Sequence, residues 1–422
     1  MTKNNPWSWI PTLYFAEGLP YFAVTVLSVI LYKRMGISNT DIALYTSWLY
    51  LPWVIKPFWS PIVDMLSTRR VWIFVTQLLL GASLASVALL IPVGEFFRWT
   101  LCLFWLIAFS SATHDIAADG FYMLGLGEEQ QSFFSGIRSI FYRISTIFGQ
   151  GVLVILAGYL EKETGNVASA WSITFGTLCL LLTILGIYHW WILPRPVKDI
   201  SRSVANVKEA MHNFAHIIAT YFKKPGIWTA MLFMLLFRLP EAQLVKMINP
   251  FLLDGKEVGG LALSTEQIGV TYGTIGVIGL IIGGIAGGIC ISQKGLKYWL
   301  WPMVMAISLP DLVYVYLSFA QPDNMIVINS CIFVEQLGYG FGFTAYMLYL
   351  IYFSRGEYAT AHYAISTAFM ALGMMLPGMV SGYIQEMFGY SNFFIWVMIC
   401  CIATFAVAAL LKIDPSFGKK QE

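Results

Sequence analysis

Apolar residues occur in long runs separated by short polar segments. Twelve runs have about 20 residues or more, the length that a helix needs to cross the hydrocarbon core of a bilayer. They cover residues 8–32, 41–63, 71–93, 98–125, 133–160, 170–193, 226–252, 264–289, 297–320, 326–353, 359–385 and 391–412. We therefore expect an all-α membrane protein with twelve transmembrane helices.

One long polar stretch divides these runs into six and six. Residues 194–225 lie between the sixth and seventh runs and carry six Lys or Arg residues. We expect an N-terminal six-helix bundle over residues 1–193, a linker over 194–225 and a C-terminal six-helix bundle over 226–422.

The composition agrees with a membrane protein and excludes other classes. Hydrophobic residues make up 58% of the 422 residues, charged residues 11%, and the mean hydropathy is +0.70. A soluble domain has about 25% charged residues. The net charge of +2 provides no basic field that would attract nucleic acid. These values exclude a soluble enzyme and a nucleic-acid-binding protein.

The distribution of Lys and Arg predicts the orientation. If both termini and the linker share one side, that side receives 16 of the 25 basic residues, the other side receives five, and four lie at membrane depth. Cytoplasmic loops carry the excess of basic residues. We therefore expect cytoplasmic termini and a cytoplasmic linker in a multi-pass protein.

A faint internal repeat occurs at an offset of 224 residues. Glu17 corresponds to Glu241, and the Tyr-Met-Leu triplet at 122–124 recurs at 346–348. Two homologous halves in parallel orientation are typical of a large transporter architecture whose site lies between the halves near the midplane.

Ionisable residues lie within the first predicted bundle, where each costs about 2.5–3.5 kcal/mol on insertion scales. Asp115 and Asp119 share a helix face at i, i+4, so they require nearby cations, for which Lys56, Arg138 and Arg143 are the candidates. Two interpretations stay open: a structural ion-pair network, or a site for a proton or a substrate. His114 either titrates near neutral pH or is a packed core histidine. The charged candidates of this half are Glu17, Lys56, Asp115, Asp119, Arg138 and Arg143.

The second half repeats this combination of charges. Arg238 and Glu241 are at i, i+3, and Pro240 between them predicts an interrupted helix. Arg238 can pair with only one or two of the acids Glu241, Asp311 and Glu335. At least one acid is then left for protonation or ligand binding, although Lys246 is a second candidate partner.

Aromatic residues on the same helices are candidates for stacking on sugar rings, with core or lipid packing as the competing interpretation. They are Tyr14, Tyr21, Tyr50, Trp53, Tyr272 and Tyr339. Seven glycines between 273 and 288 predict close helix packing rather than a phosphate cradle. The chain has no Walker lysine and no set of metal ligands with the usual spacing. We expect no metal or organic cofactor, and a proton as the coupling ion.

The loop between the second and third helices carries a charged motif. Residues 59–70 read Trp-Ser-Pro-Ile-Val-Asp-Met-Leu-Ser-Thr-Arg-Arg. This segment resembles the signature of the major facilitator superfamily, although Ser60 or Pro61 stands where a leading Gly is usual. The resemblance implies a gate motif of Asp64, Arg69 and Arg70 that holds the cytoplasmic side closed. A solvated charged turn is the alternative.

Two segments resemble the muropeptide permease family (AmpG) and the related acetyl-CoA transporters. Residues 108–119 read Ala-Phe-Ser-Ser-Ala-Thr-His-Asp-Ile-Ala-Ala-Asp, where that family has Ala-Phe-x-Ser-Ala-x-Gln-Asp-Ile-x-x-Asp. Residues 56–64 read Lys-Pro-Phe-Trp-Ser-Pro-Ile-Val-Asp and are similar to its Lys-Phe-Leu-Trp-Ser-Pro-Leu-x-Asp. His114 replaces the family Gln, and Glu17 replaces the Ser of its Ser-Gly-Leu-Pro motif.

This resemblance implies a proton-linked importer of GlcNAc–anhydro-MurNAc and its peptides for peptidoglycan recycling. It also implies a location in the bacterial inner membrane, a small glycan or glycopeptide substrate, contact with lipids and no nucleic acid, and we expect a monomer. The two departures leave open another oligosaccharide or an amphiphilic anion such as an acyl-CoA. A membrane acyltransferase and a passive channel are disfavoured, because six plus six helices with paired midplane charges is a transporter layout.

Overall fold

The computed structural model describes residues 5–196, 199 and 207–419, apart from the side chains at 61, 62, 64, 65, 128, 132 and 207–214. Its contacts divide the chain into two compact units. Unit 1 comprises Met1–Met35 and Ile55–Asn213, and unit 2 comprises Gly36–Val54 and Phe214–Glu422. The bundle boundaries expected from the sequence stay a prediction, and the contacts group residues 36–54 with the C-terminal part of the chain.

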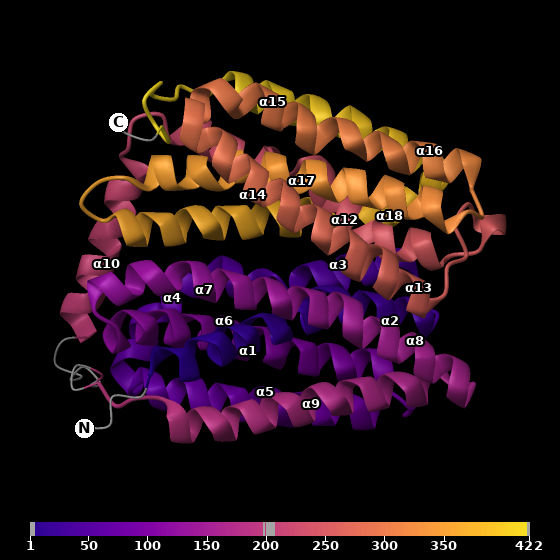
Figure 1. Ribbon diagram of the computed structural model, residues 1–422, viewed down its shortest axis with the longest axis horizontal. Coiled ribbons are helices and arrows are strands. Elements are labelled where there is room, and N and C mark those ends of the chain that lie inside the picture. Colours follow the sequence, from indigo (N-terminus) through magenta and orange to yellow (C-terminus); the bar gives the residue numbers. More distant parts are fainter. Residues whose placement is uncertain (1–4, 197–198, 200–206, 420–422) are drawn as a thin grey trace. The chain divides into compact units, whose positions relative to one another are not determined.

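Unit 1 consists of long helices that lie roughly parallel to one another (Figure 1). α5 packs against both α6 and α9, and α1 packs against α6 and α7. The elements are η1 Pro6–Ser8, α1 Ile10–Phe22, the π-helix η2 Ala23–Leu27, α2 Ser28–Arg34, α4 Leu51–Leu66, α5 Arg69–Leu90, α6 Phe96–Gly125, α7 Glu128–Thr146, the π-helix η3 Ile147–Val152, α8 Leu153–Thr164, α9 Val167–Ile192 and α10 Val207–Phe222, of which α4 begins and α10 ends in unit 2.

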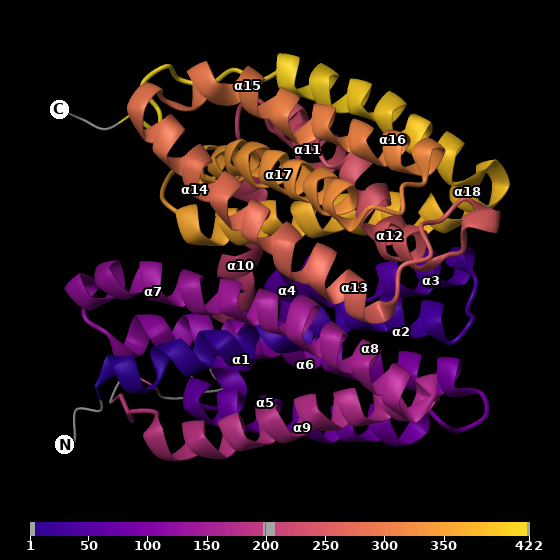
Figure 2. The same cartoon turned by 45° about the vertical axis from the view of Figure 1, so that its right-hand side comes forward.

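Unit 2 is also helical throughout its described part. α17 packs between α14 and α15, and α18 packs against α12 and α3 (Figure 2). The elements are α3 Asn39–Trp48, α11 Ile227–Leu236, α12 Leu239–Leu253, η5 Lys256–Val258, α13 Thr265–Val270, the π-helix η6 Thr271–Gly276, α14 Val277–Lys294, α15 Leu296–Ser308, η7 Leu309–Asp311, α16 Leu312–Ala320, α17 Met325–Ser354 and α18 Ala359–Ala409.

Nine helical stretches of the described chain are long and apolar enough to cross a membrane. One of them, Ala359–Ala409, covers two predicted runs and contains Gly389 in a non-helical conformation (φ 73°, ψ 166°). The predicted runs 41–63 and 226–252 are each divided into two shorter helices. The count of twelve spanning helices therefore stays a prediction.

The interruption expected at Pro240 is confirmed. α11 ends at Leu236, and Arg238 has non-helical angles (φ −98°, ψ 12°) as the N-cap of α12. Pro240 occupies the first turn of α12, where its missing N–H costs no intrahelical hydrogen bond.

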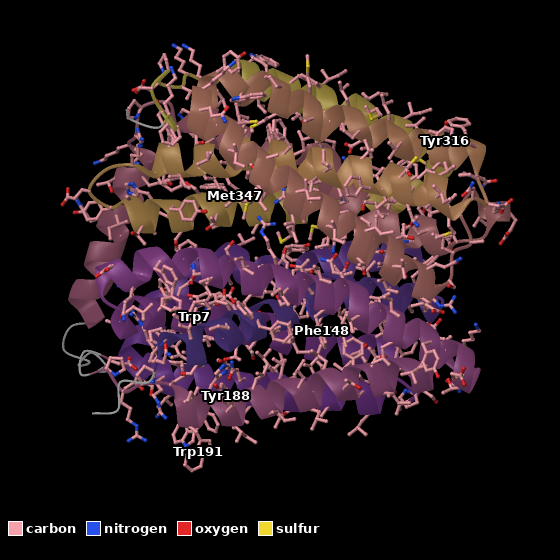
Figure 3. All side chains as sticks on the ribbon, viewed as in Figure 1. Trp7, Phe148, Tyr188, Trp191, Tyr316 and Met347 are labelled. Atoms are coloured by element: carbon pink, nitrogen blue, oxygen red, sulfur yellow. The ribbon has the colours of Figure 1, made fainter. Side chains whose placement is uncertain are left out.

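Large apolar side chains project from the outer faces of the helices. Trp191 on α9 is 78% exposed and points away from the helices of unit 1, and Tyr316 on α16 is 50% exposed (Figure 3). In water such exposure would be costly, whereas lipid tails are as apolar as these side chains. The surface is that of a membrane protein.

Close packing of α14 against α17 depends on glycines, as the sequence predicts. A Cβ at Gly283 would lie 2.0 Å from the carbonyl oxygen of Leu337, and one at Gly340 would lie 2.2 Å from that of Leu280. Both obstructing atoms belong to the backbone, so only a residue without a Cβ permits this separation.

We predict that Gly283→Ala destabilises the protein by about 1–3 kcal/mol, because the added methyl group overlaps the α17 backbone. Gly288→Ala is the matched control, since a Cβ there meets no atom within 4 Å. Melting of both purified variants in detergent tests this prediction. Equal melting temperatures for the two variants would show that the α14–α17 separation is not limited by Gly283.

Candidate functional site

Half-buried charged side chains from α1, α4, α6 and α7 meet within unit 1. α6 is one continuous helix, which confirms that Asp115 and Asp119 share a face. Lys56 on α4 forms an ion pair with Asp115, with its Nζ 3.4 Å from Asp115 Oδ2. This ion pair joins α4 to α6.

Arg138 on α7 forms an ion pair with the second carboxylate, that of Asp119. Its Nη1 lies 3.1 Å from Asp119 Oδ1 and donates to the Tyr14 hydroxyl at 3.2 Å. The Tyr14 hydroxyl donates to the same Asp119 oxygen at 3.3 Å. The guanidinium also lies over the rings of Tyr14 and Tyr122, 5.2 and 5.1 Å from their centroids. This cluster joins α1, α6 and α7.

Glu17 on α1 is the acid of this group that lacks a cation. It lies within electrostatic range of Asp115, Asp119, Lys56 and Arg138. Its Oε2 is buried without a hydrogen-bond partner, and no basic side chain of the described chain forms an ion pair with Glu17. A buried carboxylate without compensation is strongly disfavoured, so Glu17 either carries a proton or awaits a cation.

His114 belongs to a buried polar chain that crosses unit 1. The Gln77 amide donates to His114 Nε2 at 3.0 Å and accepts from His189 Nδ1 at 2.9 Å. The Thr12 hydroxyl, which donates to the Trp9 carbonyl oxygen at 3.2 Å, lies 3.0 Å from His189 Nε2. His114 Nε2 accepts from the Gln77 amide and so carries no proton, which makes the His114 ring neutral. This arrangement favours the packed core histidine, and it leaves His114 Nδ1 buried without a partner.

Arg143 lies on α7, five residues after Arg138. We expected it among the cations that answer Asp115 and Asp119, but Lys56 and Arg138 are the residues that pair with them. The half-buried Arg143 side chain has no ion pair or hydrogen bond to any described residue.

The predicted gate residues lie at the start of α5. The Asp199 carboxylate accepts from the backbone N–H groups of Arg69 and Arg70, at 2.8 and 3.1 Å, and so caps the helix. Arg69 Nη1 donates to the Gly120 carbonyl oxygen at 2.9 Å, and Arg70 donates to carbonyl oxygens at the end of α9. The Asp64 side chain lies outside the described residues, so the gate stays a prediction.

Unit 2 contains a buried ion pair at the α11–α12 interruption. Arg238 Nη2 lies 3.1 Å from Glu241 Oε1 and donates to the Tyr339 hydroxyl at 2.8 Å. Both charged side chains are only 9% exposed. The break in the helix therefore places a cation inside the unit, where α17 supplies its second partner.

The other two candidate acids of unit 2, Glu335 and Asp311, have no such cation. Glu335 on α17 accepts from the Tyr314 hydroxyl at 2.9 Å and from Gln336 Nε2 at 3.0 Å. Asp311 is buried in η7 and forms no ion pair within the described part of the chain. Arg238 is thus used by one acid of the three.

The predicted aromatic residues fall in both units. Tyr14 and Tyr21 belong to unit 1, and the other four belong to unit 2. Tyr14 and Tyr339 are partners of arginines rather than free stacking surfaces, and the Tyr50 ring lies 5.0 Å from Lys246 Nζ. Their role in sugar stacking stays a prediction.

Several polar residues that have partners in the structure were not predicted from the sequence. Gln77 and Gln336 are neutral residues inside apolar runs, and Asp199 and Tyr314 gain importance only through partners on other helices. Lys246 was considered only as a partner for acids, yet it pairs with none in the described chain. Polar residues within apolar runs were the available signal. Among the described residues, no group of His, Cys, Asp and Glu is arranged to hold a metal ion.

We predict that Arg238→Met destabilises the protein by about 3–5 kcal/mol, because it leaves Glu241 buried and unpaired. The double variant Arg238→Met/Glu241→Leu should recover most of that loss. Arg98→Met, at an exposed pair with Glu95, is the control and should change stability by about 1 kcal/mol or less. Chemical denaturation in detergent measures all three, and a double variant as unstable as Arg238→Met would contradict the pairing argument.

Known proteins resemble this chain in sequence. The anhydromuropeptide permease of Escherichia coli (strain K12) is 25% identical over 392 residues, which cover 91% of this chain and 75% of that protein. The putative transporter AmpG 4 of Rickettsia conorii is 25% identical over 408 residues and 92% of each chain. The resemblance to AmpG proteins is thereby confirmed over most of the chain.

Solved transporter structures share the fold at low sequence identity. A D-xylose–proton symporter has a TM-score of 0.72 at 11% identity and covers 98% of this chain and 99% of its own. The nucleoside transporter NupG has a TM-score of 0.68 at 16% identity, with 98% and 100% covered. The profile of the Major Facilitator Superfamily matches residues 12–374. The chain therefore belongs to the Major Facilitator Superfamily and is an integral membrane transporter of a small molecule.

Proposed function

We propose that this protein imports cell-wall muropeptides, GlcNAc–anhydro-MurNAc with or without peptide, in symport with protons. The names of the Escherichia coli and Rickettsia relatives support the substrate class. Residues 108–119, which carry Asp115 and Asp119, supply the motif that resembles AmpG proteins. Transport proceeds by alternating access, as the two homologous halves expected from the sequence suggest.

The unpaired carboxyl of Glu17 is the observation that carries proton coupling. Lys56 balances Asp115 and Arg138 balances Asp119, so the four charges cancel. For these four residues and Glu17 together, a proton on Glu17 gives a net charge of zero, whereas its loss leaves one negative charge that Arg143 does not pair with in the described chain. A conformation that shields the cluster from water is therefore less stable when Glu17 is ionised than when Glu17 is protonated. Coupling of transport to protons requires such a free-energy difference.

Unit 2 supplies a second set of acids for the same purpose. Glu335 is held by neutral donors and Asp311 has no cation in the described chain, so each can gain or lose a proton without breaking an ion pair. Asp115, Asp119 and Glu241 serve instead as counter-ions that keep Lys56, Arg138 and Arg238 in place.

The arrangement in the cell follows from the charge distribution. We infer a monomer in the bacterial cytoplasmic membrane, with both termini and residues 194–225 in the cytoplasm. Arg69, Arg70 and Asp64 act as the cytoplasmic gate, and the proton is the only cofactor.

A second candidate substrate is another oligosaccharide or an amphiphilic anion such as an acyl-CoA. Glu17 and His114 replace the Ser and Gln of the AmpG motifs, and both changes fall within the charged cluster of unit 1 or beside it. A changed cluster next to the transport path is how a different ligand would be accommodated.

Uptake of labelled GlcNAc–anhydro-MurNAc into proteoliposomes tests the proposal. We predict accumulation that rises at least tenfold with an inward proton gradient. Glu17→Gln should abolish this gradient-driven accumulation but retain substrate counterflow, because the amide imitates the protonated acid. Glu161→Gln, at an acid that pairs with Arg34 at 2.9 Å, is the control and should keep the gradient dependence.

The outcomes separate substrate from coupling. Absence of uptake by folded wild-type protein would exclude the muropeptide assignment and favour the second candidate. Gradient-driven uptake that persists in Glu17→Gln would remove Glu17 from the coupling role and leave the substrate assignment intact.

A further inference from the structure

Lys246 on α12 is a buried cation that the proposed transport cycle has not used. Its side chain is 2% exposed, its Nζ donates to Thr46 Oγ1 at 2.9 Å, and it lies 5.0 Å from the centroid of the Tyr50 ring. The Thr46 hydroxyl donates to the Ile42 carbonyl oxygen at 2.6 Å, so it can only accept from the lysine. Two of the three ammonium protons therefore have no acceptor in the described chain.

The other two buried cations of the described chain differ from Lys246 in this respect. Arg238 has a carboxylate partner, and Arg70 donates to two backbone carbonyl oxygens. No described acid forms an ion pair with Lys246. Burial of an ammonium without an anion is costly, so an anion from outside the chain would complete this site.

Unused polar atoms accompany the lysine. Ser47 adjoins Thr46 on α3, and its Oγ is buried without a partner. Asn249 lies three residues after Lys246, on the same face of α12, and its Oδ1 is also buried without a partner. The Ser47 hydroxyl is a donor that suits an oxyanion beside an ammonium, whereas Asn249 Oδ1 is an acceptor, which suits an N–H or O–H group of the ligand.

Gly378 on α18 packs closely against this group. A Cβ at that position would lie 2.8 Å from Ser47 Oγ and 3.4 Å from Lys246 Cγ. Three helices of unit 2, α3, α12 and α18, therefore enclose these polar side chains.

We propose that Lys246, Thr46, Ser47 and Asn249 form the subsite for a carboxylate group of the transported substrate. This inference rests on the proposed function, because the MurNAc lactyl group and the peptide both carry carboxylates. The carboxylate accepts hydrogen bonds from the ammonium and from Ser47, and replaces the missing counter-ion. In the enclosed state α3 covers the subsite, and the ligand enters when α3 separates from α18.

Equilibrium binding to the purified full-length protein in nanodiscs tests this subsite. The probes are GlcNAc–anhydro-MurNAc and its neutral carboxamide, which has the same shape without the charge. We expect the wild type to bind the acid at least tenfold more tightly. Lys246→Met should lose this preference by weakening only the acid, and Lys246→Arg should keep it. Lys256→Met, at a lysine that pairs with Asp323 outside the subsite, is the matched control and should match wild type.

Each outcome decides one of the two proposals. Equal wild-type affinity for acid and carboxamide, or an unchanged preference in Lys246→Met, would overturn the subsite while the muropeptide assignment stands. Equal weakening of both probes in Lys246→Met would assign Lys246 a structural role and would also overturn it. Wild-type protein that binds neither probe would overturn the substrate assignment together with the subsite. If Lys246→Met does not fold, Ser47→Ala carries the test, with a weakened acid and an unchanged carboxamide expected.

Discussion

Balance of buried charge between apolar helices is the constraint on which the rest of this structure depends. In lipid, the apolar faces of helices gain nothing from meeting one another rather than lipid tails, so they specify rotation poorly. Ion pairs specify the rotation of a helix well. The pairs Lys56–Asp115 and Arg138–Asp119 each form only when two helices turn the paired residues toward one another. The same requirement makes an unpaired group such as Glu17 informative, because its neighbours have already been neutralised.

Several polar and aromatic residues lie where helices are interrupted. Arg238 caps α12 at the α11–α12 break, Tyr50 lies between α3 and α4, and Tyr272 lies in the π-helix η6. Leu49 and Tyr50 correspond by the offset of 224 to positions 273 and 274, which lie in η6. π-Helical segments occur frequently at functional sites, which fits the polar partners gathered near these breaks.

The sequence predicted the candidate acids better than their partners. Asp115 and Asp119 were expected to share a face and to need cations, and two cations lie beside them. Arg143 was also a candidate partner for these acids, yet it forms no ion pair with a described residue. The role of His114 could not be assigned from its own helix. Its Nε2 is hydrogen-bonded to Gln77 on α5, which is hydrogen-bonded in turn to His189 on α9.

The sequence by itself determined the helical membrane architecture, the Pro240 interruption and the close α14–α17 packing. Each of these depends on one segment: the length of an apolar run, a missing N–H, or the spacing of glycines. Only the tertiary structure decided which acid meets which cation, that Glu17 stays unpaired and that Lys246 faces hydroxyls rather than carboxylates. Successive residues differ by about 100° around a helix, so a small change of rotation exchanges one partner for another. That rotation results from packing against helices far away in the chain.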